Sequence, residues 1–304
     1  MPSHVDPRAA EQRIVEAAVR LPSGGAVTGW AGLRWGGGAY FGGHDPAGGH
    51  LPVPLALDNH RKLRPQPGVE LCEEFLAVDD ITRVDGLPVT VHPRSVCRIL
   101  RTTPSLERRV AALDMAAFYD LCSLQEVLDY ARARLAGRPH VTRIWSALPH
   151  ASENSWSPRE PVMRLIWTRV AGLPEPLVNV PLFDRWGSHL VTPDLLDPAT
   201  GVVGEYDGAQ HGELRPRERD LGREELYRDL GLELVTMVSA DNRDRDGFVR
   251  RLRSAYDRAS RRPRSAAWTL QQPHWWVDTS TVARRRALDE EQRRVWLRRQ
   301  QVAA

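Results

Sequence analysis

The feature that most constrains the fold is the order of short helical and strand-like patterns between residues 158 and 262. Apolar residues recur at helical spacing in some segments and alternate with polar ones in others, with turn sequences between them. The expected elements are a helix at 158–171, strands at 177–184, 189–196 and 202–207, a helix at 217–230, a strand at 232–238 and a helix at 245–262. This order predicts an α/β domain in which helices flank a small mixed sheet.

The preceding residues favour a mostly helical region. Residues 8–20 have helical spacing, Pro22–Gly25 is a turn sequence, and Thr28 is a suitable N-cap for a short helix at 29–35. Two helices separated by a glycine turn outline a helix-turn-helix, although any two short helices would give this pattern. The polar segment 150–157 is the best domain boundary. The expected domains are a helix-turn-helix or winged-helix-like region at 1–60, a mainly helical region at 61–150, the α/β domain at 151–262 and a basic helical tail at 263–304.

Composition predicts a soluble, cytoplasmic protein. No run of 18 apolar residues occurs, and residues 1–10 lack a secretion-signal pattern, so no membrane association is expected. Three cysteines without a Cys-x-x-Cys pair argue against a disulfide framework and a zinc ribbon. The net charge is +3, but residues 241–304 contain 16 Arg and only eight acids. This imbalance suits a polyanion such as DNA, and it equally fits ordinary arginine-rich surface helices.

Two acids carry the strongest indication of chemistry. If the turn at 197–201 centres on Ala199–Thr200, Asp194 and Glu205 lie directly opposite each other on one face of a hairpin. Opposed residues have Cβ atoms roughly 5 Å apart, a spacing that suits two ligands of one cation and that is destabilising for two bare carboxylates. A slip of one residue would separate them. The alternative is a pair of solvated surface acids.

Three further residues have both a functional and an ordinary interpretation. Gly208 would allow the chain to bend and bring His211 back to the acids as a ligand or general base, or His211 is a surface residue. Glu160 could reach the site from the first helix, or it closes a capping box with Ser157. Arg223 could bind a phosphate, or it forms a helix ion pair with Asp220.

The stretch from Ser157 to about Val238 resembles uncharacterised domains related to very-short-patch repair endonucleases, within the PD-(D/E)XK nuclease superfamily. The landmarks that carry the resemblance are Ser157-x-x-Glu160-x-x-x-Arg164, Gly172-Leu-Pro-x-Pro176, Pro193-Asp194-Leu195, Glu205-Tyr-Asp-Gly-x-x-His211, Asp220-x-x-Arg223 and Gly231-Leu-Glu-Leu-Val235. The resemblance implies a restriction-endonuclease-like fold and a metal-dependent DNA endonuclease. It assigns the metal site, for Mg²⁺ or Mn²⁺, to Asp194, Glu205 and His211, with Glu160 as a further catalytic acid.

One position departs from the superfamily pattern. The catalytic lysine should follow Glu205 by two residues, where this chain has Asp207, and Lys62 is its only lysine. An arginine, Gln210 or His211 would then have to orient the attacking water.

The first region is similar, more loosely, to actinobacterial proteins whose helix-turn-helix start is compared with AbiEi-like type IV antitoxins. This similarity gives a second hypothesis, a DNA-binding regulator with an inactive nuclease-like domain and a toxin partner; a homodimer is left open. In the endonuclease hypothesis, Arg223 and the arginines of the tail (Arg284, Arg285 and Arg286) contact DNA phosphates. In the alternative for the tail, its apolar residues pack on the domain and its arginines are solvated.

Overall fold

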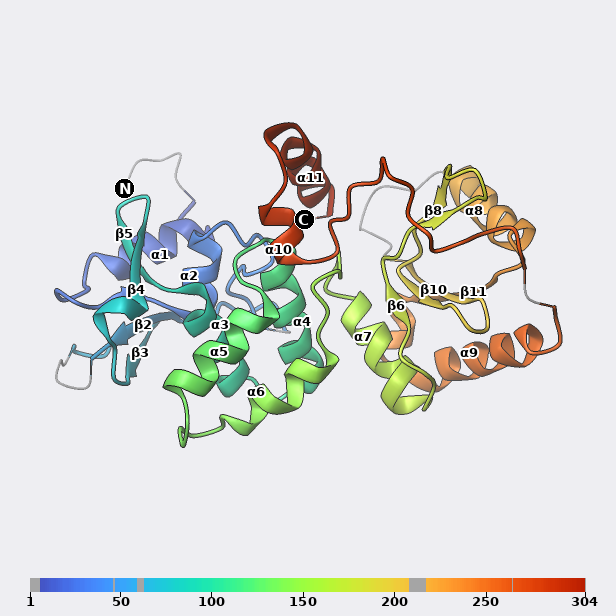
Figure 1. The fold of residues 1–304 in the computed structure, drawn as a ribbon. Coiled ribbons are helices and arrows are strands. Elements are labelled where there is room, and N and C mark those ends of the chain that lie inside the picture. Colours follow the sequence, from blue (N-terminus) through green and yellow to red (C-terminus); the bar gives the residue numbers. More distant parts are fainter. Residues whose placement is uncertain (1–5, 46, 59–62, 208–216, 264, 304) are drawn as a thin grey trace. The chain divides into compact units, whose positions relative to one another are not determined.

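The chain divides into two compact units in the computed structural model, which describes residues 6–45, 47–58, 63–207, 217–263 and 265–303 (Figure 1). Unit 1 contains residues 1–153 together with 281–304, and unit 2 contains residues 154–280. The division between Glu153 and Asn154 falls inside the polar segment 150–157. None of the helices in the described part of the chain is long and apolar enough to cross a membrane.

Unit 1 contains a five-stranded mixed sheet in the order β3-β2-β1-β5-β4. Its strands are β1 (Ala26–Val27), β2 (Val53–Leu57), β3 (Val69–Glu73), β4 (Ile81–Val84) and β5 (Leu87–Thr90). Asp85 and Gly86 form the turn between β4 and β5, and both have positive φ, 47° and 79°, as a tight hairpin turn requires. Three of these strands lie between residues 69 and 90, so the prediction that 61–150 is mainly helical holds only for its second part.

The helices of unit 1 follow the apolar periodicity of the sequence. They are α1 (Ala10–Ala18), α2 (Gly29–Trp35), α3 (His92–Thr102), α4 (Leu106–Phe118), α5 (Leu124–Arg134), α6 (Thr142–Ala147), α10 (Val282–Arg286) and α11 (Glu290–Ala303), with short turns at Val78–Asp80 and Leu148–His150. The residues from Gly29 to Leu33 are all buried. A recognition helix must expose one face to enter the major groove. The burial of α2 therefore argues against its use as a DNA-reading helix.

The C-terminal segment 281–304 belongs to unit 1 and not to a separate tail domain. Arg285 is fully buried, and its guanidinium donates to Asp120 at 2.7 Å and to the carbonyl of Ala117 at 2.6 Å. Trp296 is 2% exposed, and its indole N–H also donates to Asp120. For Arg285 and Trp296, the interpretation in which the tail packs on the protein is the one that applies.

Unit 2 is built around a four-stranded mixed sheet in the order β11-β10-β9-β6. Its elements are α7 (Glu160–Leu165) with a π-helical turn at Ile166–Val170, β6 (Leu177–Val178), β7 (Leu182–Phe183), β8 (His189–Val191), β9 (Leu195–Asp197), β10 (Val202–Asp207), α8 (Arg217–Asp229), β11 (Glu233–Val238), a short turn at Ser239–Asn242 and α9 (Arg245–Ala259). The order of helices and strands and the mixed sheet match the expectation.

Two of the expected strands are each broken into two. The segment 189–196 forms β8, which pairs with β7 in a separate two-stranded sheet, and then β9, which pairs with β10. The segment 177–184 divides likewise into β6 and β7. Alternating apolar residues predicted one continuous strand in each case, but the chain changes sheets between them.

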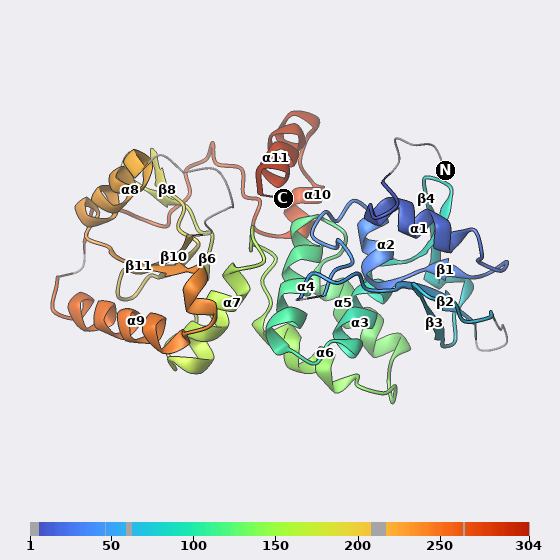
Figure 2. The same ribbon diagram turned by 180° about the vertical axis from the view of Figure 1, so that it is seen from behind.

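Helices cover both faces of the main sheet of unit 2, as Figure 2 shows from behind. On one face, Met163 and Trp167 pack with Phe248 and Leu252 of α9 against the sheet. On the other face, α8 and the β7–β8 hairpin pack through a second cluster that includes Tyr227. Successive residues of β10 point to alternate faces, which decides where its acids lie.

Candidate active site

The register of the β9–β10 hairpin brings Asp194 and Glu205 together. Leu195 pairs with Gly204 and Asp197 with Val202 in antiparallel register. Extended by one residue, this register places Asp194 opposite Glu205, and the turn centres on Ala199–Thr200 as expected from the sequence. Opposed side chains point to the same face of the sheet. The two carboxylates are close enough to interact electrostatically, as this register leads one to expect.

Asp194 is fixed by the backbone on both sides of the hairpin. Its Oδ2 accepts a hydrogen bond from the backbone N–H of Tyr206 at 2.8 Å, and its carbonyl accepts one from the N–H of Asn179 at 3.0 Å. A carboxylate held by a neighbouring strand has little freedom to turn away from its partner. Its position is therefore set by the sheet.

Glu205 points toward α8, on the face opposite to α9. Its side chain is 15% exposed, and its Oε1 accepts hydrogen bonds from Arg223 Nη2 at 2.8 Å and from the Tyr227 hydroxyl. Burial and the nearby Asp194 carboxylate raise the pKa of Glu205 to about 7, although Arg223 and Tyr227 act in the opposite direction. A pKa this high means that the surroundings of Glu205 stabilise its negative charge less well than water does.

Glu160 joins the two acids from the start of α7. It is 3% exposed and its Oε2 accepts from the backbone N–H of Trp156 at 2.9 Å and from the Asn179 side chain at 2.5 Å. Burial and the Asp194 carboxylate raise its pKa well above the usual range. The capping-box interpretation is wrong, because the N-cap residue of α7 is Arg159, no side-chain cap hydrogen bond forms, and the Glu160 carboxylate accepts from the backbone N–H of Trp156 instead of that of Ser157.

Asn179 is a site residue that sequence reasoning missed. It is 3% exposed, has φ 48°, and connects Glu160 through its side chain with Asp194 through its backbone N–H. Asparagine adopts positive φ more readily than most residues. A single asparagine among the apolar residues of the expected strand 177–184 was the available signal, and it marks the point where β6 ends.

Arg223 contributes a positive charge to the site. Besides Glu205, its Nη2 donates to the carbonyl of Thr192 at 3.2 Å. Arg223 pairs with Glu205, a strand residue 18 positions away, whereas the side chain of Asp220, its alternative partner along the helix, lies outside the described part of the structure. The other arginines assigned to DNA, Arg284 to Arg286, lie in unit 1, and the burial of Arg285 against Asp120 contradicts a phosphate contact for that residue.

Two predicted residues fall outside the described part of the chain. Gln210 and His211 belong to the segment 208–216, for which the structure gives no description. Asp207, which stands where the superfamily has lysine, is exposed at the end of β10. Near the site, the described residues therefore supply three acids and one arginine.

The described residues fit a divalent cation by their charge, without forming a complete ligand set. Over these residues, no group of three or more His, Cys, Asp or Glu side chains lies close enough to hold a metal ion. Burial first, and then the Asp194 carboxylate, raise the pKa values of Glu160 and Glu205, and a cation beside these acids would act against both causes. Carboxylate oxygens are the ligands that Mg²⁺ prefers.

Comparison with known proteins adds no relative. No family model, no curated protein and no solved structure matches this chain.

Proposed function

We propose that unit 2 is a metal-dependent DNA endonuclease domain of the restriction-endonuclease-like fold. The observation that carries the proposal is the opposed pair Asp194 and Glu205, held on one face of a mixed sheet between two helical layers. Buried acids with strongly raised pKa values cluster at functional sites. The sequence resemblance to very-short-patch repair endonucleases points to the same residues.

The residues that would hold Mg²⁺ or Mn²⁺ are Asp194 and Glu205, with His211 as the expected third ligand. When bound, such an ion polarises the scissile phosphate and lowers the pKa of a coordinated water. The contribution of the chain's own residues is to hold the two acidic ligands in position. The Tyr206 N–H fixes Asp194, while Tyr227 and Arg223 hold Glu205 by one oxygen.

Arg223 supplies the positive charge that the missing lysine would have provided. Its side chain is 40% exposed, while one of its nitrogens is bound to Glu205. An arginine keeps its charge at any working pH and can pair with a phosphate oxygen. We assign it the stabilisation of charge on the phosphate.

The alternative hypothesis, a DNA-binding regulator with an inactive domain, is less well supported. It needs an exposed reading helix in the first region, and α2 is buried. It also assigns no purpose to three acids that destabilise each other. Retained DNA binding without cleavage would favour it.

The proposal is tested by incubating the purified protein with supercoiled and single-stranded DNA in Mg²⁺ or Mn²⁺. Asp194→Asn is expected to lower the cleavage rate by at least about 100-fold, because it removes a charged ligand of the metal ion. Asp229→Asn, which changes an exposed acid of α8, serves as the matched control and should cut normally. Absence of cutting in the wild type with every substrate and either metal would refute the proposal.

A further inference from the structure

Unit 2 also carries an aromatic cluster outside the acidic site. We define it as Trp186, His189, Trp275 and Trp276, with Phe183 beneath them. Phe183 is fully buried, and its ring meets those of Trp275 and Trp276 edge-on at 6.1 and 5.0 Å. His189 stacks on Trp276 with ring centroids 5.1 Å apart. The cluster therefore has an ordered base in the β7–β8 hairpin and the segment that follows α9.

Trp186 is the exposed member of this cluster and lies at the tip of the hairpin. Its residue surface is 75% exposed. The turn beneath it is nevertheless well fixed, because Asp184 Oδ1 accepts hydrogen bonds from the backbone N–H groups of Trp186 and Ser188, both at 2.8 Å. A large ring held in solvent on an ordered turn does not contribute to the core. One exposed ring is ordinary, but Trp275 is also 51% exposed and its Nε1 lies 4.0 Å from a Cβ added at Gly187, so two large exposed rings flank this turn.

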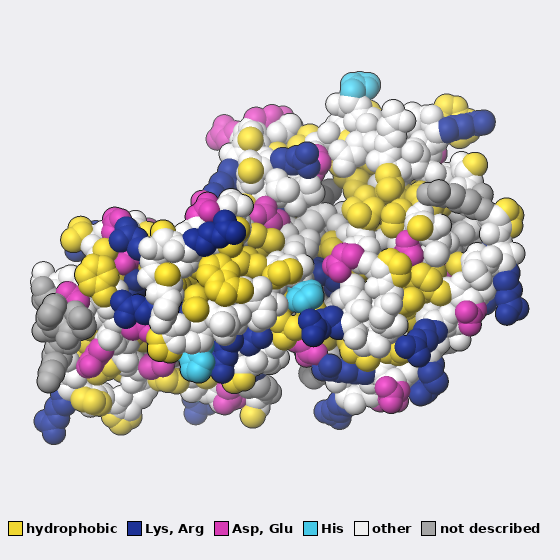
Figure 3. Space-filling view, turned by 60° about the horizontal axis from the view of Figure 1, so that its bottom comes forward, with side chains coloured by type: hydrophobic (Ala, Val, Ile, Leu, Met, Phe, Trp, Pro, Cys, Tyr) yellow, Lys and Arg dark blue, Asp and Glu magenta, His cyan; other side chains and the backbone are white. Residues whose placement is uncertain are grey.

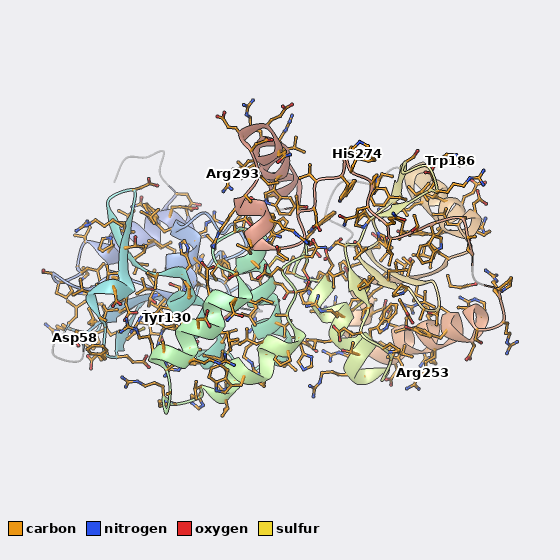
Figure 4. The ribbon with its side chains drawn as sticks, in the orientation of Figure 1. Asp58, Tyr130, Trp186, Arg253, His274 and Arg293 are labelled. Carbon is orange, nitrogen blue, oxygen red and sulfur yellow. The ribbon has the colours of Figure 1, made fainter. Side chains whose placement is uncertain are left out.

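The second segment of the cluster comes close to this tip. A Cβ added at Gly187 would lie 3.1 Å from the side chain of Pro273. Backbone hydrogen bonds between Phe183 and Thr269 tie the segment to β7. Figure 4 shows the labelled Trp186 and His274 at the same end of unit 2, with Arg253 at the other. The exposed rings thus gather on one surface.

The positive charge beside Trp186 indicates which class of molecule this surface binds. The Arg185 guanidinium lies 4.1 Å from the centroid of the Trp186 ring, so a flat aromatic face and a phosphate-binding group stand together at the tip. Surfaces that bind single-stranded nucleic acid combine such rings, which stack on bases, with arginines that contact the backbone. Protein interfaces are enriched in the same residue types, so oligomer formation is an outcome that the test must separate from DNA binding.

The aromatic cluster and the acids are separated by only a few residues of the chain. Val191 ends β8, and Asp194 follows three residues later. Eight residues separate Trp186 from Asp194, so their Cα atoms are at most about 28 Å apart. A strand of several nucleotides is long enough to occupy both places.

We propose that the Trp186 tip stacks on an unpaired base, and that the substrate of unit 2 is DNA with a single-stranded segment beside the cleavage position. The choice of DNA rests on the proposed nuclease function, whereas the stacking contact does not. Arg185 would bind the phosphate next to that base.

The test is fluorescence anisotropy of a labelled single-stranded DNA 20-mer and its blunt duplex, in EDTA to prevent cleavage. Trp186→Ala is expected to weaken binding of the single strand by about 5- to 150-fold, the range for one stacked base, and Trp186→Phe should retain most of the affinity. Phe75→Ala, which removes an aromatic ring of unit 1 that is 53% exposed, is the matched control and should bind as the wild type does.

The possible outcomes distinguish a failure of the stacking proposal from a failure of the nuclease proposal. Equal affinities of the wild type and Trp186→Ala, or tighter binding of the duplex than of the single strand, would overturn the stacking contact. Tighter binding of an RNA 20-mer would overturn the choice of DNA. If Trp186→Ala instead dissolves an oligomer in sedimentation velocity with unchanged DNA affinity, the cluster is a protein interface. Loss of binding in this variant supports stacking even where no cleavage is found.

Discussion

Replacing Glu205 with glutamine should stabilise unit 2 in the absence of metal. The pKa of Glu205 is about 7 against 4.5 for an unperturbed glutamate. Because each pKa unit corresponds to 1.36 kcal/mol, ionising this group in the folded protein costs about 3 kcal/mol. The amide of Glu205→Gln is uncharged and can still accept from Arg223 and Tyr227. The pKa of about 7 already includes the favourable influence of Arg223 and Tyr227, so the expected gain at pH 8 is about 3 kcal/mol.

The pH dependence follows from the direction of the shift. A carboxyl whose pKa is raised by folding binds its proton more tightly in the folded state, so its cost is absent below about pH 4.5 and complete above about pH 7. The wild type should therefore lose stability between these values. Glu205→Gln should lose less, and the difference between the two proteins should vanish near pH 5.

The measurement is urea-dependent hydrogen exchange of peptides from β10 and α9, in EDTA at pH 5 and pH 8. It reports the opening free energy of unit 2 separately from that of unit 1. The control is Glu233→Gln, because Glu233 is paired with Arg258 and Arg262 and its loss should destabilise the unit at both pH values. If Glu205→Gln is less stable than the wild type at pH 8, the repulsion inferred for the acidic pair is wrong.

Three other substitutions test separate parts of the structure. Arg285→Met should destabilise unit 1 by about 3–5 kcal/mol in urea unfolding, because it leaves Asp120 buried without its charge partner. Gly204→Ala should cost unit 2 about 1–3 kcal/mol by hydrogen exchange, since the new Cβ would lie 3.0 Å from the Trp167 ring. Asn179→Ala should cost about 1–3 kcal/mol in the same assay, because it removes a hydrogen bond to a buried acid.

The part of the site that could be predicted from the sequence depends on local geometry. The turn from Asp197 to Gly201 is short, with the Asp197 side chain accepting from Ala199 N–H and Thr200 Oγ1 and with Gly201 at φ 76°. Such a turn sets the register of its hairpin, and the register sets which side chains oppose each other. The relation between Asp194 and Glu205 was predictable for this reason.

The partners of these acids were not predictable, because they come from tertiary packing. Arg223 and Tyr227 meet Glu205 only after α8 packs on the sheet, from 18 and 22 residues away. The pairing of Arg285 with Asp120 spans 165 residues, and no local pattern separates a buried arginine from a solvated one. Five arginines lie on α9, within the arginine-rich segment 241–304 that composition indicated, and Figure 3 shows several dark blue Lys and Arg side chains on the surface.

Arg223 and a bound cation would compete for the Glu205 carboxylate, because each would offset the repulsion between Asp194 and Glu205. Arg223 and Tyr227 occupy one of its oxygens, and their influence leaves its pKa near 7 rather than higher. A cation placed between Asp194 and Glu205 would act in the same direction as Arg223, and more strongly, because it would offset the charge of both acids. Metal binding should therefore be weak below pH 7, where Glu205 holds a proton, and should strengthen above it. It should also reduce the hold of Glu205 on Arg223, which would free that guanidinium for a phosphate at the moment when the ion is in place.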